Sequence, residues 1–302
     1  MVEVQAGTQR RDRVRSTRVP RHRETQPVED FSASFTALGD LAYDGAQVSA
    51  SVTDLDTGKT LVAIDERIVL PTASIGKILL LVEVSARLTE RDFSGYGILD
   101  KTPRDAVGES GIWQHLQAPS LPVADLATLV GATSDNLATN VLLRQVGLDA
   151  VRARTESLGL MRTALLDLVR DSRGPDDAPQ LSVGSTAELS WLFAALARGE
   201  IVDTLTSSRV LGWLSLNSDF SLVASAFGLD PLSHRGTDHG VLLVNKTGSD
   251  AGVRSEAGVL RGPRTAVSYA ASVQFNDSGL AARLRVLDAL RVVGLDILEY
   301  VH

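Results

Sequence analysis

Segments with the alternation typical of β-strands lie toward both ends of this 302-residue chain, and helical patterns occupy its middle. Near the start, residues 46–65 alternate apolar and polar side chains around an aspartate-threonine-glycine turn, which predicts a hairpin. Strand patterns return only at 240–248, 255–262 and 265–275. Since strands and helices do not alternate along the chain, we expect an antiparallel sheet assembled from both ends.

Helical periodicity accounts for most of the remaining chain. Amphipathic helices are expected at 29–43 and 279–300. The segment 74–90 is apolar on nearly every side, which predicts a buried helix. Further helices are expected at 123–133, 135–147, 148–159, 186–198 and 204–216.

The order of these patterns predicts an α/β (α+β) fold. Residues 29–66 and 228–302 form a sheet lobe, and residues 67–227 are inserted into it as an all-helical lobe. With 44% hydrophobic residues, the chain can bury cores of this size. Its net charge of −7 argues against a general nucleic-acid binder, and no apolar run approaches the ~18 residues of a membrane span. The absence of cysteine excludes disulfides and thiol catalysis.

The first 28 residues differ from the rest, because seven arginines fall between Arg10 and Arg23 with little apolar between them. This composition predicts a disordered basic arm. A secretory signal has an apolar stretch of ~7–15 residues after its basic start, and none occurs here. We therefore expect a cytoplasmic protein, and a monomer.

A serine and a lysine stand three residues apart at the start of the apolar segment, as Ser74 and Lys77. One interpretation is structural: Ser74 caps the helix and Lys77 extends to water. The other is chemical: residues i and i+3 share a helix face, and a buried lysine loses its charge and can take the serine's proton. The chain has only four lysines among 30 basic residues, and arginine would serve solubility equally well.

Two further short motifs follow in order, Ser134-Asp135-Asn136 and Lys246-Thr247-Gly248. The first joins two predicted helices and the second ends a predicted strand. Together with Ser74-Ile75-Gly76-Lys77 they match the S-x-x-K, S-D-N and K-T-G motifs of class A β-lactamases and penicillin-binding proteins. From about residue 29 to 302 the sequence resembles this family.

The resemblance implies a serine hydrolase that acts on cyclic amides and forms an acyl-enzyme. Ser74 matches the acylated serine, Lys77 the lysine that helps to deprotonate it, and Ser134 the hydroxyl that passes a proton to the leaving nitrogen. The backbone N–H groups of Ser74 and Ser249 would form the oxyanion hole.

The resemblance also implies how a substrate is held. Asn136 matches the residue that binds the substrate amide, and Lys246 and Thr247, with Gly248 beside them, match the group that binds its carboxylate. Arg254 is expected to reinforce the carboxylate site. The expected partner is a small β-lactam or acyl substrate, with a role in antibiotic resistance; neither a metal nor another cofactor is expected.

One family feature is missing. Class A enzymes carry a Glu-x-x-x-Asn motif whose glutamate activates the deacylating water, but residues 165–182 contain neither glutamate nor asparagine. Among its aspartates, Asp171 lies nearest in register and is the candidate replacement. Arg170 and Arg173 stand beside it and are expected to lower its pKa.

This departure leaves three interpretations of the function. The protein is a β-lactamase-like hydrolase with slow deacylation, or a non-turning-over penicillin-binding pseudoenzyme that holds acyl ligands, or a peptidase or esterase of the same fold. A solvated loop would explain the aspartates of residues 165–182 without any catalytic role.

Overall fold

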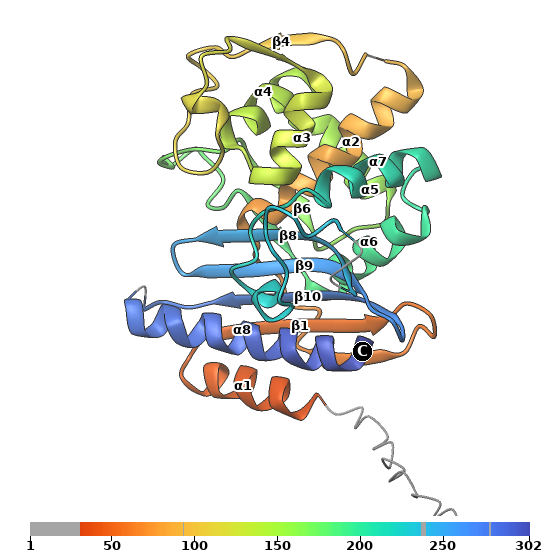
Figure 1. Ribbon diagram of the computed structural model, residues 1–302. Helices are drawn as coiled ribbons and strands as arrows, with labels where there is room; N and C mark the ends of the chain where they lie inside the picture. The colour runs from red at the N-terminus through yellow and green to blue at the C-terminus, as the bar shows by residue number, and fades with distance from the viewer. Residues whose placement is uncertain (1–30, 93, 237–239, 278) are drawn as a thin grey trace, which may run out of the picture.

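The structure is a computed structural model that describes residues 31–92, 94–236, 240–277 and 279–302 (Figure 1). A β-sheet with two helices on its outer face forms the lower half of the view, and a helical lobe stands above it. The predicted basic arm, residues 1–28, lies outside the described residues.

The main sheet has five antiparallel strands in the order β2-β1-β10-β9-β8. The early hairpin supplies β1 (Gln47–Asp54) and β2 (Thr60–Ile64), and the end of the chain supplies β8 (Leu242–Asp250), β9 (Val253–Arg261) and β10 (Ala266–Gln274). Because β1 pairs with β10, the two ends of the chain form one sheet. The sequence prediction of an antiparallel sheet built from both ends is confirmed.

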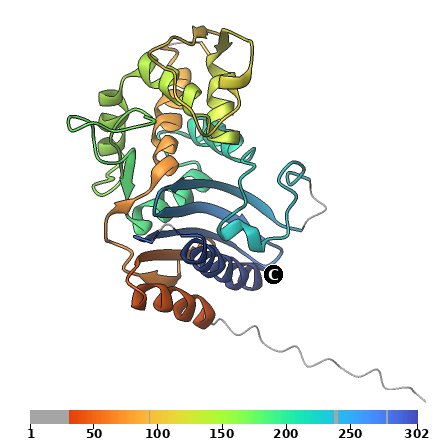
Figure 2. The ribbon, with the colours of Figure 1, turned by 90° about the vertical axis from the view of Figure 1, so that its left-hand side faces the viewer.

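Two helices cover the outer face of this sheet, α1 (Ser32–Tyr43) and α8 (Leu280–Val301) (Figures 1 and 2). Each turns an apolar stripe inward, as the sequence periodicity predicts. On α8 the stripe consists of Val286, Leu290, Val293 and Ile297, all buried. These side chains, the outer face of the sheet and the 3₁₀ turn η3 (Val223–Ala226) form one hydrophobic core.

The inner face of the sheet is covered by α6 (Thr186–Arg198) and by the helical lobe. The central helix of that lobe is α2 (Lys77–Glu90), in which the ten residues from Lys77 to Ala86 are all buried. Four helices pack around it and explain why its sequence is apolar on nearly every side: α3 (Val123–Thr133), α4 (Asn136–Val146), α5 (Leu148–Ser157) and α7 (Thr204–Leu214).

Short strands and 3₁₀ turns complete the structure, and of these β3, β7 and η1 lie where the helical lobe meets the main sheet. The main ones form a three-stranded sheet of β3, β7 and β6, and a two-stranded one of β4 and β5, within segments that the sequence leaves as loops. The bounds are β3 Leu70–Pro71, β4 Ile98–Asp100, β5 Ser120–Pro122, β6 Ala164–Leu165, β7 Ser182–Gly184, η1 Ala73–Gly76 and η2 Trp113–His115.

The lobe boundary expected at residue 228 stays a prediction. Phe220 and Phe227 pack in the core between the sheet and α8, which favours a boundary somewhat earlier in the chain.

Within the described ranges, no helix combines the length and the apolar character needed to cross a membrane.

Candidate active site

Ser74 lies in the 3₁₀ turn η1, directly before α2. It does not cap that helix, since the N-cap position is held by Gly76. The preceding Ala73 has a left-handed φ of +47°, which is unusual for a residue with a Cβ atom. Ser182 on β7 stabilises this strained residue by donating a 2.6 Å hydrogen bond to the Ala73 carbonyl. The turn leaves Ser74 partly exposed where the two lobes meet.

Lys77 is fully buried and does not extend to water. Its Nζ donates 2.6 Å hydrogen bonds to the Ser134 carbonyl and to Asn136 Oδ1, and lies 3.2 Å from Ser134 Oγ. A neutral amine has two N–H donors and one lone pair. The Ser134 carbonyl and Asn136 Oδ1 can accept the two N–H bonds, and the Ser134 hydroxyl can donate to the lone pair. The surroundings of Lys77 therefore suit an uncharged amine.

The electrostatic surroundings of Lys77 also favour its uncharged form. Burial, the largest effect, and the positive charge of Lys246 lower the pKa of Lys77 well below its ordinary value, although Asp135 and Glu109 oppose them. A lysine with such a pKa can accept a proton near neutral pH. The structural interpretation of the motif, a capping serine with an extended lysine, is thus wrong for both residues.

Ser134 joins α3 to α4 in a left-handed conformation, with φ of +55°. Its neighbour Asp135 caps α4 through a 2.9 Å hydrogen bond from the Ala138 N–H. The other carboxylate oxygen of Asp135 accepts from the amides of Ile112 and Trp113, both at 2.8 Å. Asp135 therefore fixes a loop of the helical lobe against the turn that carries Ser134.

Lys246 on β8 is also fully buried. Its Nζ donates to Ser134 Oγ at 3.0 Å and to the next carbonyl along the strand at 2.7 Å. The Ser134 hydroxyl consequently lies between two lysines, Lys77 and Lys246. Burial lowers the pKa of Lys246 to about 8, while the nearby carboxylates of Asp219 and Glu256 oppose the shift. At neutral pH Lys246 is therefore mostly an ammonium ion.

Gly248 explains how β8 comes close to the serine turn. A Cβ atom at this position would lie 2.1 Å from the carbonyl oxygen of Thr72, so only glycine fits. The adjacent Thr247 donates a 2.6 Å hydrogen bond from its hydroxyl to Asp219 Oδ2. The third motif is thereby held beside the turn that contains Ser74, although β8 continues past it to Asp250.

Beyond Gly248, a cavity of about 370 Å³ is bordered by Ser249 and Arg254, and also by Glu109 and Arg283. Burial and the positive charge of Arg283 lower the pKa of Arg254. The cavity therefore carries two guanidinium groups, which can bind an anionic ligand group, and two carboxylates, Glu109 and Asp250.

Asp171 is exposed, and its Oδ1 accepts a 2.8 Å hydrogen bond from the Gly108 amide. It borders a second cavity, of about 430 Å³, together with Lys101. Among the described residues, no hydrogen bond joins Asp171 to Ser74 or Lys77. Hydrogen bonds thus join Lys77, Ser134, Asn136 and Lys246 directly, whereas Asp171 is linked to Asn136 only through the backbone of Gly108.

Arg170 and Arg173 bond to Asp167, so the expected contact with Asp171 is corrected. Arg170 Nε and Arg173 Nη1 lie 2.9 Å and 2.8 Å from Asp167 Oδ2, and Arg170 also pairs with Asp177. Burial alone would raise the pKa of Asp167, but these arginines and the Leu168 amide lower it below its ordinary value. The loop bends so that its arginines reach back over three and six residues to Asp167, while Asp171 bonds to the Gly108 amide.

Val169 is the loop residue fixed most directly to the helix of the second motif. Asn140 brackets its backbone, accepting from the Val169 N–H at 2.9 Å and donating to its carbonyl at 3.0 Å. Asn140 lies one turn along α4 from Asn136, on the same face. An aliphatic side chain, not a carboxylate, therefore occupies this part of the loop.

Sequence reasoning missed two acidic residues, Asp219 and Glu109. Asp219 contacts Thr247 and acts on Lys246, while Glu109 acts on Lys77 and borders the cavity beside Ser249. No motif marks either residue, because their roles depend on loops that the tertiary fold brings to the cluster.

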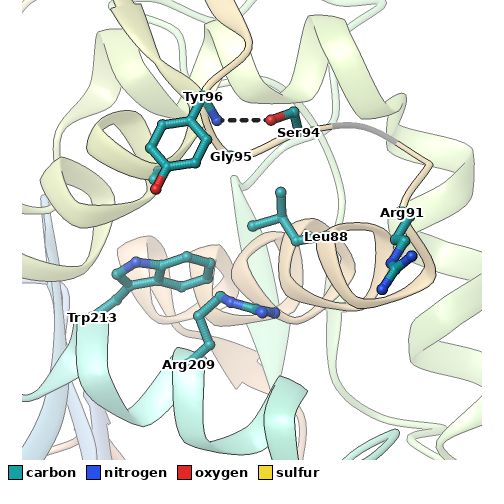
Figure 3. Close-up of a pocket in the computed structure, with 8 residues that line it drawn as sticks. Leu88, Arg91, Ser94, Gly95, Tyr96, Arg209 and Trp213 are labelled. Atoms are coloured by element: carbon teal, nitrogen blue, oxygen red, sulfur yellow. Dashed lines mark hydrogen bonds between the residues drawn. The ribbon is translucent and has the colours of Figure 1, made fainter.

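Another cavity, of about 690 Å³, lies at the far end of α2 between Leu88, Tyr96, Arg209 and Trp213 (Figure 3). Leu88 is eleven residues from Lys77 along α2, or roughly 16 Å. Size therefore does not identify the active site in this molecule; the buried amines do.

An antiparallel sheet beside a helical lobe, with a serine turn and two buried lysines between them, is the arrangement of serine hydrolases of the β-lactamase fold. A model of the beta-lactamase enzyme family matches residues 30–301, and the chain belongs to that family. Comparison with curated proteins gives no match.

Solved structures agree with the fold. A β-lactamase from Sphaerobacter thermophilus is 23% identical with a TM-score of 0.77, covering 88% of this chain and 96% of that one. PBP-A is 19% identical with a TM-score of 0.75, covering 89% and 95%. A class A β-lactamase from Mycobacterium abscessus is 18% identical with a TM-score of 0.72, covering 86% and 97%.

Proposed function

We propose that this protein is a serine hydrolase that forms an acyl-enzyme at Ser74 with β-lactams or similar acyl compounds, and that it releases the acyl group slowly. The observation that carries the proposal is the hydrogen-bonded row of Lys77, Ser134 and Lys246. Two amines buried around one hydroxyl are costly to fold and are useful for moving protons.

In the proposed reaction, the Lys77 amine takes the Ser74 hydroxyl proton while Ser74 Oγ bonds to the substrate carbonyl carbon. The Lys77 ammonium then returns a proton through Ser134 to the ring nitrogen, and the carbon–nitrogen bond breaks. The 3.2 Å spacing between Lys77 Nζ and Ser134 Oγ supports this relay. In the proposed oxyanion hole, the amides of Ser74 and Ser249 stabilise the tetrahedral intermediate.

The substrate carboxylate would bind beside Lys246, Thr247 and Ser249, with Arg254 behind them. Lys246 supplies an ammonium group and Thr247 a hydroxyl, and the neighbouring cavity contributes Arg254 and Arg283. These cations favour substrates with an anionic group, although the carboxylates of Glu109 and Asp250 border the same cavity. Asn136 Nδ2 donates a 2.9 Å hydrogen bond to the Gly108 carbonyl, and Asn136 would hold the substrate amide by exchanging that contact.

Slow deacylation is proposed because the loop supplies no evident base. Asp167 is held by two arginines, Asp171 is bonded to Gly108, and Val169 occupies the position fixed by Asn140. One solved structure of a PBP-A variant, similar to this chain with a TM-score of 0.75, is an acyl-enzyme complex with penicillin G. The second candidate is therefore a non-turning-over penicillin-binding protein, which the same loop geometry favours.

Intact-mass spectrometry after mixing with benzylpenicillin tests both candidates. We expect a single covalent adduct on Ser74 that decays over minutes to hours, with Ser74→Ala as the control that forms none. An adduct that never decays would favour the binding protein. If no adduct forms with penicillins, while simple esters or peptides are hydrolysed in a Ser74-dependent way, the protein is an esterase or peptidase of the same fold.

A further inference from the structure

Glu256 on β9 is completely buried beneath the third motif, and the proposed reaction does not use it. It stands opposite Thr247 in the β8–β9 register. Its Oε1 accepts hydrogen bonds from Tyr269 Oη at 2.7 Å and from Asn245 Nδ2 at 2.8 Å, and its Oε2 accepts from the Ala224 amide at 3.2 Å. All three partners are donors, so the site is shaped for a carboxylate.

The contacts continue from Glu256 to the loop that carries Asp219. Asn245, held by Glu256, accepts a 2.8 Å hydrogen bond from Asn217 Nδ2, and Asn217 also donates to the Asp219 carbonyl at 3.2 Å. Asp219 in turn accepts from the Thr247 hydroxyl. Glu256 is thus the buried end of a network that includes both chain neighbours of Lys246, Asn245 and Thr247, and reaches Asp219 beside the proposed carboxylate site.

Gly258, on the same strand as Glu256, leaves room for the side chains of this network. A Cβ atom at Gly258 would lie 2.7 Å from the Val244 carbonyl oxygen and 2.9 Å from both Tyr269 Oη and Asn245 Cβ, so a larger residue would displace the β8 backbone and these side chains. Burying a carboxylate costs free energy unless it is paired, and a core position on a β-strand is filled more stably by an apolar residue. A glutamate in this place therefore calls for a use of its charge.

That charge acts on Lys246. Ionisable groups from several elements act on the two lysines. Glu256 on β9 and Asp219 in the loop before η3 act on Lys246. Asp135 and Glu109 in the helical lobe, together with Lys246, act on Lys77. Glu256 itself faces Tyr269 on β10 and Asp219, whereas η3 presents a backbone amide. Without a carboxylate nearby, a lysine buried as deeply as Lys246 would lose its proton more easily.

We propose that Glu256 is a positioning residue that fixes Asn245 and the Asp219 loop and holds Lys246 as an ammonium ion, so that the site recognises anionic acyl substrates. The identity of the substrate group rests on the proposed function. The effect of Glu256 on Lys246 does not. It makes Glu256 a specificity residue that never touches the substrate.

The ionisation states are consistent with this role. Burial raises the pKa of Glu256 to about 7, although hydrogen bonds from Tyr269, Asn245 and the Ala224 amide favour the charged form. Burial and the Glu256 charge raise the pKa of Tyr269 well above its ordinary value, so Tyr269 stays a donor. Between the pKa of Glu256, about 7, and that of Lys246, about 8, both groups are mostly ionised.

Lysine-selective ¹³C,¹⁵N labelling and NMR test the proposal directly, because the chain has only four lysines and Lys246→Arg identifies the relevant signal. Glu256→Gln keeps the shape and removes the charge, so the Lys246 titration midpoint should fall by about one pH unit. Glu299→Gln, at an exposed position on α8, makes the same change in net charge and should leave the midpoint in place.

Tyr269→Phe is a milder second variant, available if Glu256→Gln does not fold. It removes one donor that favours the ionised Glu256 carboxylate, so it should move the Lys246 midpoint in the same direction by less. An unchanged midpoint in the folded variants, or an equal fall in Glu299→Gln, would overturn the proposal.

The pH profile of acylation by benzylpenicillin tests the link to substrate. At pH 8, a midpoint lowered by about one unit reduces the ammonium fraction about fivefold, and acylation of Glu256→Gln should fall by that factor through weaker binding. Below about pH 6 both proteins keep Lys246 charged, and their rates should converge. A shifted midpoint with unchanged acylation at pH 8 would refute the specificity role. If the wild type forms no adduct at any pH, the proposed function fails, and the NMR midpoint still decides whether Glu256 holds the charge of Lys246.

Discussion

The cluster of Lys77, Ser134 and Lys246 and the loop of residues 165–182 use charge in opposite ways. In the cluster, Lys77 and Lys246 are fully buried and hydrogen-bond to neutral oxygens. In the loop, Asp167 is bonded to Arg170 and Arg173, both partly exposed. Burial without a bonded counter-ion lowers the pKa of both amines and so favours their neutral, basic form, whereas pairing lowers the pKa of the carboxylate and makes it a weaker base.

The two regions differ in role: one carries the proposed catalytic groups, and the other stabilises the structure of a loop. The first region is arranged to form an acyl-enzyme, and the second holds its own shape without presenting a free base. Variants in each region should therefore change different steps, and four of them test this division.

The largest effect is expected at Ser74, since Ser74→Ala removes the proposed nucleophile. Acylation by benzylpenicillin and turnover of nitrocefin should fall at least about a thousandfold, measured by intact mass and by absorbance. The thermal midpoint should stay within a few degrees, because a partly exposed hydroxyl is lost. A variant with wild-type turnover would place the nucleophile elsewhere.

Val169→Glu puts a carboxylate on the loop residue that Asn140 holds against α4. We expect the steady-state rate after the burst to rise about tenfold or more, while the burst itself is unchanged. The matched control is Val169→Gln, which has the same shape without the base and should show no rise. Equal rates in the two variants would mean that this position does not face the ester.

Asp167→Asn breaks the arginine pairs of the loop and should cost about 1–2 kcal/mol of stability at pH 7. Folding lowers the pKa of Asp167. The stability that Asp167 contributes is therefore fully present when the pH is above its unfolded-state pKa, and it is lost as the pH falls through its folded-state pKa. Unfolding in urea between pH 5 and pH 2 should therefore depend less on pH in the variant. Asp176→Asn, on an exposed residue of the same loop, is the control and should behave as wild type.

The smallest effect is expected for Asp171→Asn. Asparagine keeps an oxygen that can accept from the Gly108 amide, so the slow phase of nitrocefin turnover should change less than about twofold. The burst of about one equivalent should remain. Collapse of the slow phase with the burst preserved would instead identify Asp171 as the deacylation base.

The sequence by itself determined the features that depend on local order. The periodicity of residues 46–65 and 240–275 predicted the antiparallel sheet, and the apolar segment 74–90 predicted a buried helix but left open whether Lys77 is buried or extends to water. The three short motifs predicted that Lys77, Ser134 and Lys246 would meet, because each motif fixes a turn or strand end whose partners recur in this family. These signals are readable since strand alternation, helix periods and turn residues act over a few neighbouring positions.

Only the tertiary structure decided which side chains pair across long separations. Arg170 and Arg173 could bond to any of several aspartates, and loop geometry selects Asp167. In the sequence, Glu256 is indistinguishable from other residues of a predicted strand. Only the assembled strands β8, β9 and β10 place it against Asn245 and Tyr269. Such choices depend on distances of a few ångströms between elements far apart in the chain, and both burial and charge interactions change steeply over those distances.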